Sequence, residues 1–184
     1  MKRGVNLQTD QFQEEFFRYL IVERGYSEKT KKAYQEDMSD FFHFLKESGN
    51  EDPLAVEYRD VRVYLSYLTE RGYSRNSISR KMASLRSFYQ FLTKHEIVKE
   101  NPFAYIHLKK KNAKLPRFFY EKEMDALFQS VAGDEPLQQR NQALLEVLYG
   151  SGLRVSECSS LTLGAIDWES GVLLIHGKGN KDRY

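Results

Sequence analysis

A repeated segment in the first hundred residues is the feature that most constrains the fold of this chain. The run Glu23-Arg24-Gly25-Tyr26-Ser27 returns 47 positions later as Glu70-Arg71-Gly72-Tyr73-Ser74. The same offset relates Phe41-Phe42-His43-Phe44-Leu45 to Phe88-Tyr89-Gln90-Phe91-Leu92. Because both matches keep one register, they predict two copies of a single supersecondary unit.

Each copy is predicted to form a helix, a short turn and a second helix. Gly25 and Gly72 stand where a helix C-terminal glycine belongs, and Ser27 and Ser74 are natural N-caps for the helix that follows. Apolar residues recur at helical spacing on both sides of each turn. Before the turn they are Phe12, Phe16, Tyr19 and Leu20 in copy one, and Val61, Tyr64, Leu65 and Leu68 in copy two. After it they are Ala33, Tyr34, Met38, Phe41, Phe42 and Leu45, and then Ile78, Met82, Leu85, Phe88, Tyr89 and Leu92. The pattern predicts a mainly α unit of four helices in two crossed hairpins.

A linker and a second unit are expected after residue 108. The segment 109–117 is basic, contains a proline and lacks an apolar period, so we predict that it joins a unit at 1–108 to one at 118–184. Helices are expected over Glu121–Val131, Asn141–Tyr149 and around Val155–Leu161, and strands over Ala165–Trp168 and Val172–His176. The run 177–180 is typical of a turn between strands, which predicts a hairpin or three-stranded sheet. The sequence stops at Tyr184, inside the next expected strand, and this predicts truncation within the second unit.

The charge of the chain is unevenly distributed. The net charge is +2, but residues 1–114 carry 21 basic and 16 acidic side chains, a balance of +5, and the remainder has a balance of −3. The segment from Arg71 to His95 contains no Asp or Glu. The basic half is therefore the candidate for a polyanionic partner, although a charge run is also typical of a solvated face.

Cysteine, histidine and hydropathy patterns exclude several classes of protein. Cys158 is the only cysteine, and the four histidines are scattered, so neither a disulfide nor a metal site is expected. No apolar run is long enough to span a membrane, and the polar N-terminus does not resemble a signal peptide. We expect a cytoplasmic protein that needs no cofactor.

Polar and basic residues lie opposite the apolar stripes of the second helix in each copy. A helix N-terminus with hydroxyl, amide and basic side chains suits phosphate docking and base reading in a major groove. The candidate DNA-binding residues are Lys29, Thr30 and Lys32 in copy one, and Asn76, Ser77, Arg80, Lys81 and Arg86 in copy two.

Two basic residues in the second unit are candidates for phosphate chemistry. Arg154 follows a glycine turn at the expected start of a helix, where it could hold a phosphate. Lys178 lies in the predicted turn. Each is weak evidence by itself, because a surface arginine at a helix start and an exposed turn lysine are common.

Taken together, these motifs resemble the tyrosine recombinase or integrase family, and specifically its bacterial Xer type. Gly152-Leu153-Arg154-Val155-Ser156-Glu157, followed by Gly177-Lys178-Gly179-Asn180-Lys181, is similar to the first half of that family's active site. Ser27-x-x-Thr30-x-x-x-Tyr34-x-x-Asp37-Met38 and the run 80–89 are similar to its N-terminal core-binding domain, and Leu115-Pro116-Arg117 to its interdomain linker. The resemblance covers almost the whole chain.

The resemblance implies a four-helix SAM-like core-binding domain followed by the start of an α+β catalytic domain. It implies DNA cleavage and exchange through a 3′-phosphotyrosyl link without metal or cofactor. In that reaction Arg154 stabilises charge at the phosphate, Lys178 protonates the leaving 5′-oxygen, and Glu157 supports Arg154. Implied partners are double-stranded DNA with a dif-like site, a second recombinase subunit in a tetrameric synaptic complex, and a DNA translocase. The implied task is resolution of chromosome dimers. The resemblance is closer to the XerC and XerD type than to phage integrases with arm-binding domains.

The chain departs from the family pattern in several places. Cys158-Ser159-Ser160 replaces a more usual apolar run, and Tyr120 stands where a capping Ser or Thr is typical. The family's downstream His-x-x-Arg pair and tyrosine nucleophile are absent, and Tyr184 is expected to be a plain strand residue. The 184-residue chain by itself is therefore expected to bind DNA without cleaving it. His176 is expected to be structural or solvent-facing, and Cys158 to be a small thiol packed beneath the short helix.

Two other hypotheses remain open from the residues alone. The chain could be a non-catalytic DNA-binding module, or its helical half could be a protein-interaction bundle. The protein-interaction bundle leaves Arg154 and Lys178 unexplained. The non-catalytic DNA-binding module suits a chain that ends naturally.

Overall fold

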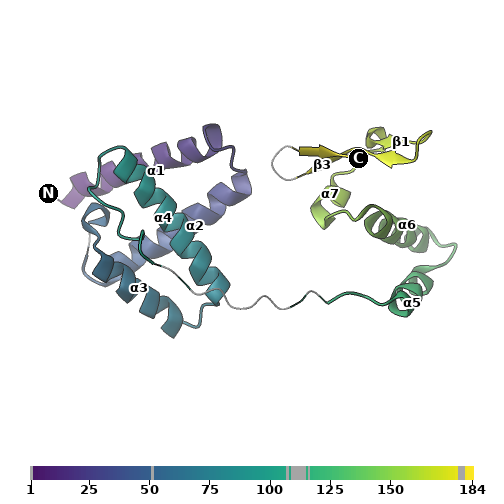
Figure 1. Cartoon of the computed structure of the whole chain (residues 1–184), viewed down its shortest axis with the longest axis horizontal. Helices are drawn as coiled ribbons and strands as arrows, with labels where there is room; N and C mark the ends of the chain where they lie inside the picture. The colour runs from purple at the N-terminus through teal and green to yellow at the C-terminus, as the bar shows by residue number, and fades with distance from the viewer. Residues whose placement is uncertain (1, 51, 107, 109–114, 116, 178–180) are drawn as a thin grey trace. The chain divides into compact units, whose positions relative to one another are not determined.

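The computed structural model describes residues 2–50, 52–106, 108, 115, 117–177 and 181–184, with side chains described from residue 9 onward except at 181 (Figure 1). The chain divides into two compact units, residues 1–112 and 113–184.

The first unit contains four crossing helices. They are α1 (Lys2–Val22), α2 (Glu28–Glu47), α3 (Tyr58–Glu70) and α4 (Arg75–Lys94), with a 3₁₀ turn, η1 (Pro53–Ala55), between α2 and α3 (Figure 1). The α1–α2 and α3–α4 pairs are the two copies of the repeat. The predicted mainly α fold, with four helices in two hairpins, is confirmed.

The turns between these helices have the conformations that the sequence predicts. Gly25 and Gly72 have φ values of +62° and +74°, the left-handed region that glycine adopts without steric cost. The Ser27 hydroxyl accepts a hydrogen bond from the Thr30 N–H at 3.3 Å, and the Ser74 hydroxyl accepts one from the Ser77 N–H at 3.1 Å. Both copies therefore end one helix and cap the next in the same way.

Aromatic side chains dominate the interior of the first unit. Phe16, Phe41, Tyr64 and Phe88 are fully buried, one from each helix. The ring of Phe41 lies with its centroid 4.9 Å from that of Tyr64 and 5.4 Å from that of Phe103, which follows α4. Each such side chain contributes about 1.5–3 kcal/mol by burial, so this core fixes how α2 and α4 cross.

The second unit contains three helices and four short strands. The helices are α5 (Glu121–Val131), α6 (Pro136–Ser151) and α7 (Val155–Ser159), followed by a 3₁₀ turn, η2 (Leu163–Ala165). The strands are β1 (Ile166–Asp167), β2 (Val172–Leu173), β3 (Ile175–Gly177) and β4 (Lys181–Arg183).

The second helix of this unit is longer than the sequence predicts. It begins at Pro136 instead of Asn141, because Pro136 suits the first helical position and the Glu135 N–H donates to the Gln138 side chain at 3.2 Å. It ends at Ser151, before Gly152 with φ +59°. The α5 helix has the predicted bounds although Tyr120 precedes it, since the Glu123 carboxylate accepts from the Tyr120 N–H at 2.9 Å.

The predicted β-hairpin is confirmed by the pairing of β3 with β4, whereas the alternative of one three-stranded sheet is not formed by the described residues. The strands form two separate antiparallel pairs, β1 with β2 and β3 with β4. Ile166 faces Leu173, and His176 faces Asp182. The expected strand 172–176 is interrupted at Leu174, whose N–H still bonds to the Ala165 carbonyl at 2.8 Å, and the chain then pairs with β4.

The second unit has little apolar interior among its described residues. Leu153 and Ile175 are its buried apolar side chains. Tyr149, Trp168 and Tyr184 are each at least 65% exposed. The described helices are also too short or too polar for a membrane span.

Candidate functional site

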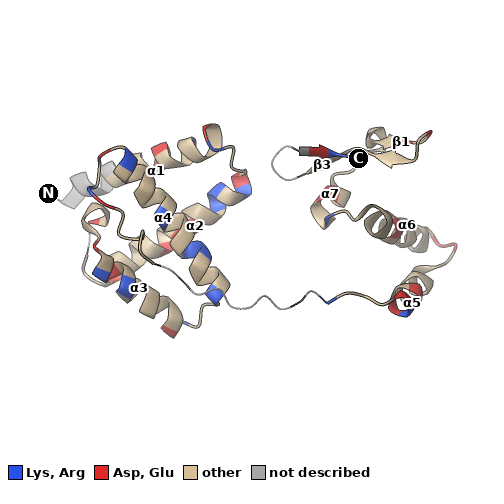
Figure 2. Cartoon of the chain, viewed as in Figure 1, with Lys and Arg blue, Asp and Glu red and all other residues tan. Residues whose placement is uncertain are grey.

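The second helices of the two repeat copies lie side by side in the first unit. The Arg80 guanidinium donates to the Ala33 carbonyl at 3.3 Å, and the Ser84 hydroxyl donates to the Asp37 carboxylate at 3.0 Å. Residue numbers rise together across these contacts, so α2 and α4 run in the same direction where they meet. Their N-terminal turns therefore lie at the same end of the unit, and Lys and Arg residues, blue in Figure 2, occur in the first half of both helices.

Several predicted DNA-binding residues are accessible at this end. Lys29, Lys32 and Asn76 are exposed. Thr30 and Ser77 are half-buried, and their hydroxyls bond to the N-capping hydroxyls of Ser27 and Ser74 at 3.0 and 2.9 Å. These two hydroxyls therefore stabilise the helix starts, while the lysines and the asparagine face solvent.

Lys81 differs from this prediction because its side chain is buried. Its ammonium donates to Asp37 at 3.1 Å and to Asp40, and only 4% of its side chain is exposed. Burial alone would lower the pKa of Lys81, but the hydrogen bonds and charges of Asp40 and Asp37 outweigh it and the pKa is raised. A charged lysine held between two carboxylates connects α2 to α4, so we remove it from the predicted DNA-binding face.

Arg86 is also held by internal partners. Its Nε donates to the Phe103 carbonyl at 3.0 Å, and its Nη2 donates to the Ile106 carbonyl. The Asn101 side chain donates in turn to the Arg86 carbonyl at 3.0 Å. This arginine fixes the segment after α4, because its fork of donors matches two backbone acceptors, and its role in DNA binding stays a prediction.

Arg80 combines an internal contact with an accessible position. Its Nη1 lies 2.6 Å from an oxygen of Asp37, which is fully buried, while 46% of the Arg80 side chain is exposed. A guanidinium has five donors, so the contact to Asp37 fixes its orientation and leaves other N–H groups for a phosphate or a base.

Arg154 lies next to Glu157 in the second unit. Arg154 precedes α7, and Glu157 lies in that helix. The Arg154 N–H donates to Glu157 Oε2 at 2.9 Å, and its Nη1 donates to Glu157 Oε1 at 2.7 Å. The Arg154 side chain is 62% exposed, whereas that of Glu157 is 6% exposed. The carboxylate thus holds the backbone and the guanidinium of one residue and leaves the cation facing solvent.

Arg183 contacts the same carboxylate and was not among the predicted site residues. Its Nη2 donates to Glu157 Oε2 at 2.9 Å from strand β4. The backbone and side-chain hydrogen bonds of Arg154 lower the pKa of Glu157, and the charge of Arg183 lowers it further, so the group is ionised at neutral pH. Sequence spacing gives no signal for Arg183, because the contact depends on how β4 pairs with β3.

The other residues of this unit that the sequence singled out are Lys178, His176 and Cys158. Lys178 lies outside the described residues. His176 is exposed, and its Nδ1 lies 2.7 Å from Asp182 Oδ1. Cys158 is a half-buried free thiol. The described residues include no group of three or more His, Cys, Asp or Glu side chains arranged to hold a metal ion.

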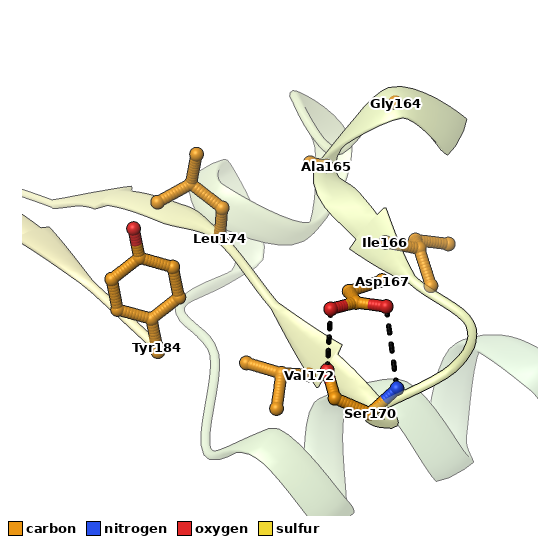
Figure 3. Close-up of a pocket in the computed structure, with 8 residues that line it drawn as sticks. All are labelled: Gly164, Ala165, Ile166, Asp167, Ser170, Val172, Leu174 and Tyr184. Carbon is orange, nitrogen blue, oxygen red and sulfur yellow. Dashed lines mark hydrogen bonds between the residues drawn. The ribbon is translucent and has the colours of Figure 1, made fainter.

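A hollow of about 280 Å³ lies beside β1 and β2, lined by residues between Gly164 and Leu174 and by Tyr184 (Figure 3). Its one carboxylate, Asp167, accepts from the Ser170 hydroxyl at 2.6 Å and from the Ser170 N–H at 3.2 Å. These hydrogen bonds lower the pKa of Asp167. The described lining residues include no cationic side chain, and Asp167 serves the turn between the strands.

Family models match both units. A model described as the N-terminal SAM-like domain of phage integrases matches residues 14–96, and one described as the phage integrase family matches residues 117–184. Together they match most of the chain. The chain belongs to the tyrosine recombinase family.

Relatives within the recombinase family are similar over nearly all of this chain. It is 54% identical over 170 residues to the tyrosine recombinase XerC of Lacticaseibacillus casei, which covers 92% of the chain and 57% of that protein. It is 47% identical over 178 residues to XerC of Listeria innocua, covering 96% of the chain and 59% of that protein. The chain thus spans less than two thirds of the length of these relatives.

Solved recombinase structures share the fold. A crystal structure of XerH recombinase bound to a palindromic difH substrate has a TM-score of 0.66 at 19% identity, covering 87% of this chain and 49% of that one. A Tn1549 transposon integrase in complex with transposon right end DNA has a TM-score of 0.64 at 20% identity, covering 90% and 54%. These likenesses show that the helical N-terminal domain and the small antiparallel sheets are a recombinase fold.

Proposed function

We propose that this chain is part of a site-specific DNA recombinase of the Xer type, and that its first unit binds duplex DNA. The observation that carries the proposal is the arrangement of Arg154 on Glu157, with an exposed guanidinium held by a buried carboxylate. It occurs in a chain 54% identical to a tyrosine recombinase XerC. Family membership and an oriented phosphate-binding cation support the same chemistry.

The proposed DNA-binding face is the common end of α2 and α4. Lys29, Lys32 and Asn76 are exposed there, and Arg80 is held by Asp37 with about half of its side chain accessible. Two helix starts at one end can contact neighbouring phosphates and base edges of one groove region. Thr30 and Ser77 remain candidates through their backbone positions at the helix starts.

The proposed reaction is a transesterification at a DNA phosphate. A tyrosine oxygen forms a bond to phosphorus as the bond from phosphorus to the 5′-oxygen breaks, and the 5′-oxygen takes up a proton. Negative charge grows on the non-bridging oxygens in the transition state, where Arg154 would meet it. We propose Lys178 as the proton donor and Glu157 as the support of Arg154. The attacking tyrosine is proposed to lie in sequence that the XerC relatives have beyond the matched region.

We further propose a dif-like DNA site and chromosome dimer resolution as the biological task, in the cytoplasm. A tetramer with a second recombinase subunit and a DNA translocase as a partner belong to the same proposal. The XerH structure described as bound to a difH substrate supports the choice of site.

The domain arrangement is part of the proposal: a core-binding domain at 1–108, a linker at 109–117 and a catalytic part at 118–184. Limited proteolysis of the chain without DNA is expected to cut first in the linker. Early cleavage within 72–92, with the linker left intact, would contradict this boundary.

The experiment that tests the function has two steps. The 184-residue chain is titrated onto a dif-like duplex, where salt-dependent binding is expected, and is then tested for a covalent complex, which is not expected. A chain extended to the length of the XerC relatives is tested on the same duplex with a nick that traps the cleaved strand. Absence of a covalent protein–DNA complex from that chain would overturn the recombinase proposal.

A further inference from the structure

We infer that Arg183 is a positioning residue for Arg154 and acts through the shared carboxylate of Glu157. This inference rests on the proposed function and deepens it by adding a second arginine to the support of the phosphate-binding cation. Arg183 does not need to touch DNA in this role.

The geometry of the carboxylate supports the inference. Glu157 Oε2 accepts the Arg154 backbone N–H and the Arg183 Nη2, each at 2.9 Å, while Oε1 accepts the Arg154 Nη1 at 2.7 Å. The Glu157 side chain is 6% exposed, so solvent provides few competing donors. Three hydrogen bonds, two of them charge-assisted, therefore hold both carboxylate oxygens in place.

A second contact connects the same arginine to the loop before Arg154. The Arg183 Nη2 lies 3.5 Å from the carbonyl oxygen of Gly152, the residue that follows α6 and has φ +59°. Arg183 therefore contacts α7 through Glu157 and the preceding turn through Gly152. Both contacts hold the short segment 152–157 against strand β4.

Loss of Arg183 should mainly affect the orientation of the Glu157 carboxylate. Without it, Oε2 keeps only the backbone N–H, and the carboxylate can rotate and take Arg154 with it. Catalysis by a fixed cation depends on its position, and a displacement of about 1 Å can cost on the order of 10²-fold in rate. Arg183→Gln should therefore reduce cleavage by about 10- to 100-fold, and Arg183→Lys, which keeps one charged donor, by less.

The first arm of the test does not depend on recombination. The pKa of Glu157 is measured by NMR titration in the 184-residue chain, in Arg183→Gln and in the control Arg140→Gln. Arg140 is an exposed arginine of α6 whose side chain bonds to Asn141. We expect the pKa of Glu157 to rise in Arg183→Gln and to stay unchanged in the control. An unchanged pKa in both variants would overturn the inference.

The second arm measures cleavage by the extended recombinase on duplexes with oxygen or sulfur at the 5′-bridging position. A thiolate leaves without a proton, so a defect that acts through the proton donor is corrected by sulfur, and one that acts through Arg154 is not. Equal defects of Arg183→Gln on both substrates, partly restored in Arg183→Lys, are expected. Selective rescue by sulfur, or full activity of Arg183→Gln, would overturn the role.

The two arms separate this inference from the proposed function. If the extended recombinase without substitutions forms no covalent complex, the proposed function is contradicted. The pKa of Glu157 in the 184-residue chain then still decides whether Arg183 holds the carboxylate. An active recombinase with an insensitive Arg183→Gln contradicts only the inference. Thermal unfolding and DNA binding of each variant are measured in parallel, and a loss of cleavage that merely follows a loss of folding also counts against a positioning role.

Discussion

The hydroxyl of Ser84 donates to the buried carboxylate of Asp37 across 3.0 Å, and these two residues hold the same place in the two copies of the repeat, 47 positions apart. Arg80 and Ala33, which are also in contact, have the same separation. The second helices therefore meet at equivalent positions. Asp37 is the charged member of this contact, and it accepts from Arg80, Lys81 and Ser84.

Removal of Asp37 is expected to destabilise the first unit strongly. Asp37→Asn leaves the ammonium of Lys81, with 4% of its side chain exposed, paired only with Asp40. Breaking a buried ion pair on one side typically costs about 3–5 kcal/mol, whereas Asp40→Asn, at a half-exposed carboxylate, should cost about 1 kcal/mol or less. Urea denaturation of both variants measures the difference, and similar midpoints would show that Asp37 has no special role.

Two buried tyrosines provide a matched pair for hydrogen-bond energetics. The Tyr89 hydroxyl donates to the Pro53 carbonyl at 2.6 Å, while the buried Tyr64 hydroxyl has no hydrogen-bond partner within the described residues. Tyr89→Phe should cost about 1–3 kcal/mol because it leaves a buried acceptor unpaired, and Tyr64→Phe should be neutral or stabilising. Denaturation midpoints of the two variants are compared, and an equal or larger loss in Tyr64→Phe would contradict this assignment.

The same tyrosines predict a loss of stability at high pH. Burial, followed by the nearby charge of Asp52, raises the pKa of Tyr89 well above that of a free tyrosine, and burial followed by the charge of Asp40 raises that of Tyr64. Because the pKa of each tyrosine is raised in the folded state, folding favours the protonated hydroxyl. The contribution of that hydroxyl to stability is fully present below the unfolded pKa of about 10 and is lost as pH rises towards the folded pKa. Unfolding midpoints from pH 8 to about 11 should fall most steeply near the upper end. The double variant with Phe at 64 and 89 should show a flatter profile.

The sequence predicted the helical repeat well because its signals are local. Gly25, Gly72, Ser27 and Ser74 determine the turns and caps by their own backbone preferences, and the apolar stripes give the core of the first unit. It did not predict the burial of Lys81, because a basic residue on a polar helix face is expected to be solvated, and the buried position depends on Asp37 of the neighbouring helix. A signal was present, since Asp37 falls within the apolar stripe of α2.

The site in the second unit was predicted in part. Arg154 and Glu157 are three residues apart, so their contact follows from local geometry around a helix start. Arg183 is 26 residues from Glu157, and its contact depends on strand pairing that the sequence did not specify. The division of the strands into two pairs was not predicted for the same reason. Leu174 has a side chain typical of a strand, so the sequence does not mark it as the residue at which the strand is interrupted.

The proposed DNA-binding face predicts a specific pattern of salt dependence. Lys32→Ala should weaken binding and reduce the slope of log affinity against log salt by about 0.9, the loss of one phosphate contact. Arg80→Ala should weaken binding similarly. Lys46→Ala removes the same charge from the last turn of α2, at the far end of the helix, and is the matched control. If Lys32→Ala and Arg80→Ala bind as well as the unchanged chain, the proposed face is wrong.

The roles of Arg154 and Lys178 can be separated by the chemistry of the leaving group. In the extended recombinase, Arg154→Ala should lose about 10²–10³-fold in cleavage with little loss of DNA binding, since its guanidinium meets charge that develops in the transition state. Lys178→Ala should lose about 10²–10⁴-fold on an oxygen-bridged substrate, the usual contribution of a general acid. A sulfur at the 5′-bridging position should restore Lys178→Ala selectively, because a thiolate departs without a proton. Arg154→Ala should stay defective on both substrates, because the charge on the non-bridging oxygens is the same in each. The assay follows the covalent protein–DNA complex over time at saturating protein, and equal defects of Lys178→Ala on both substrates would remove its role as proton donor.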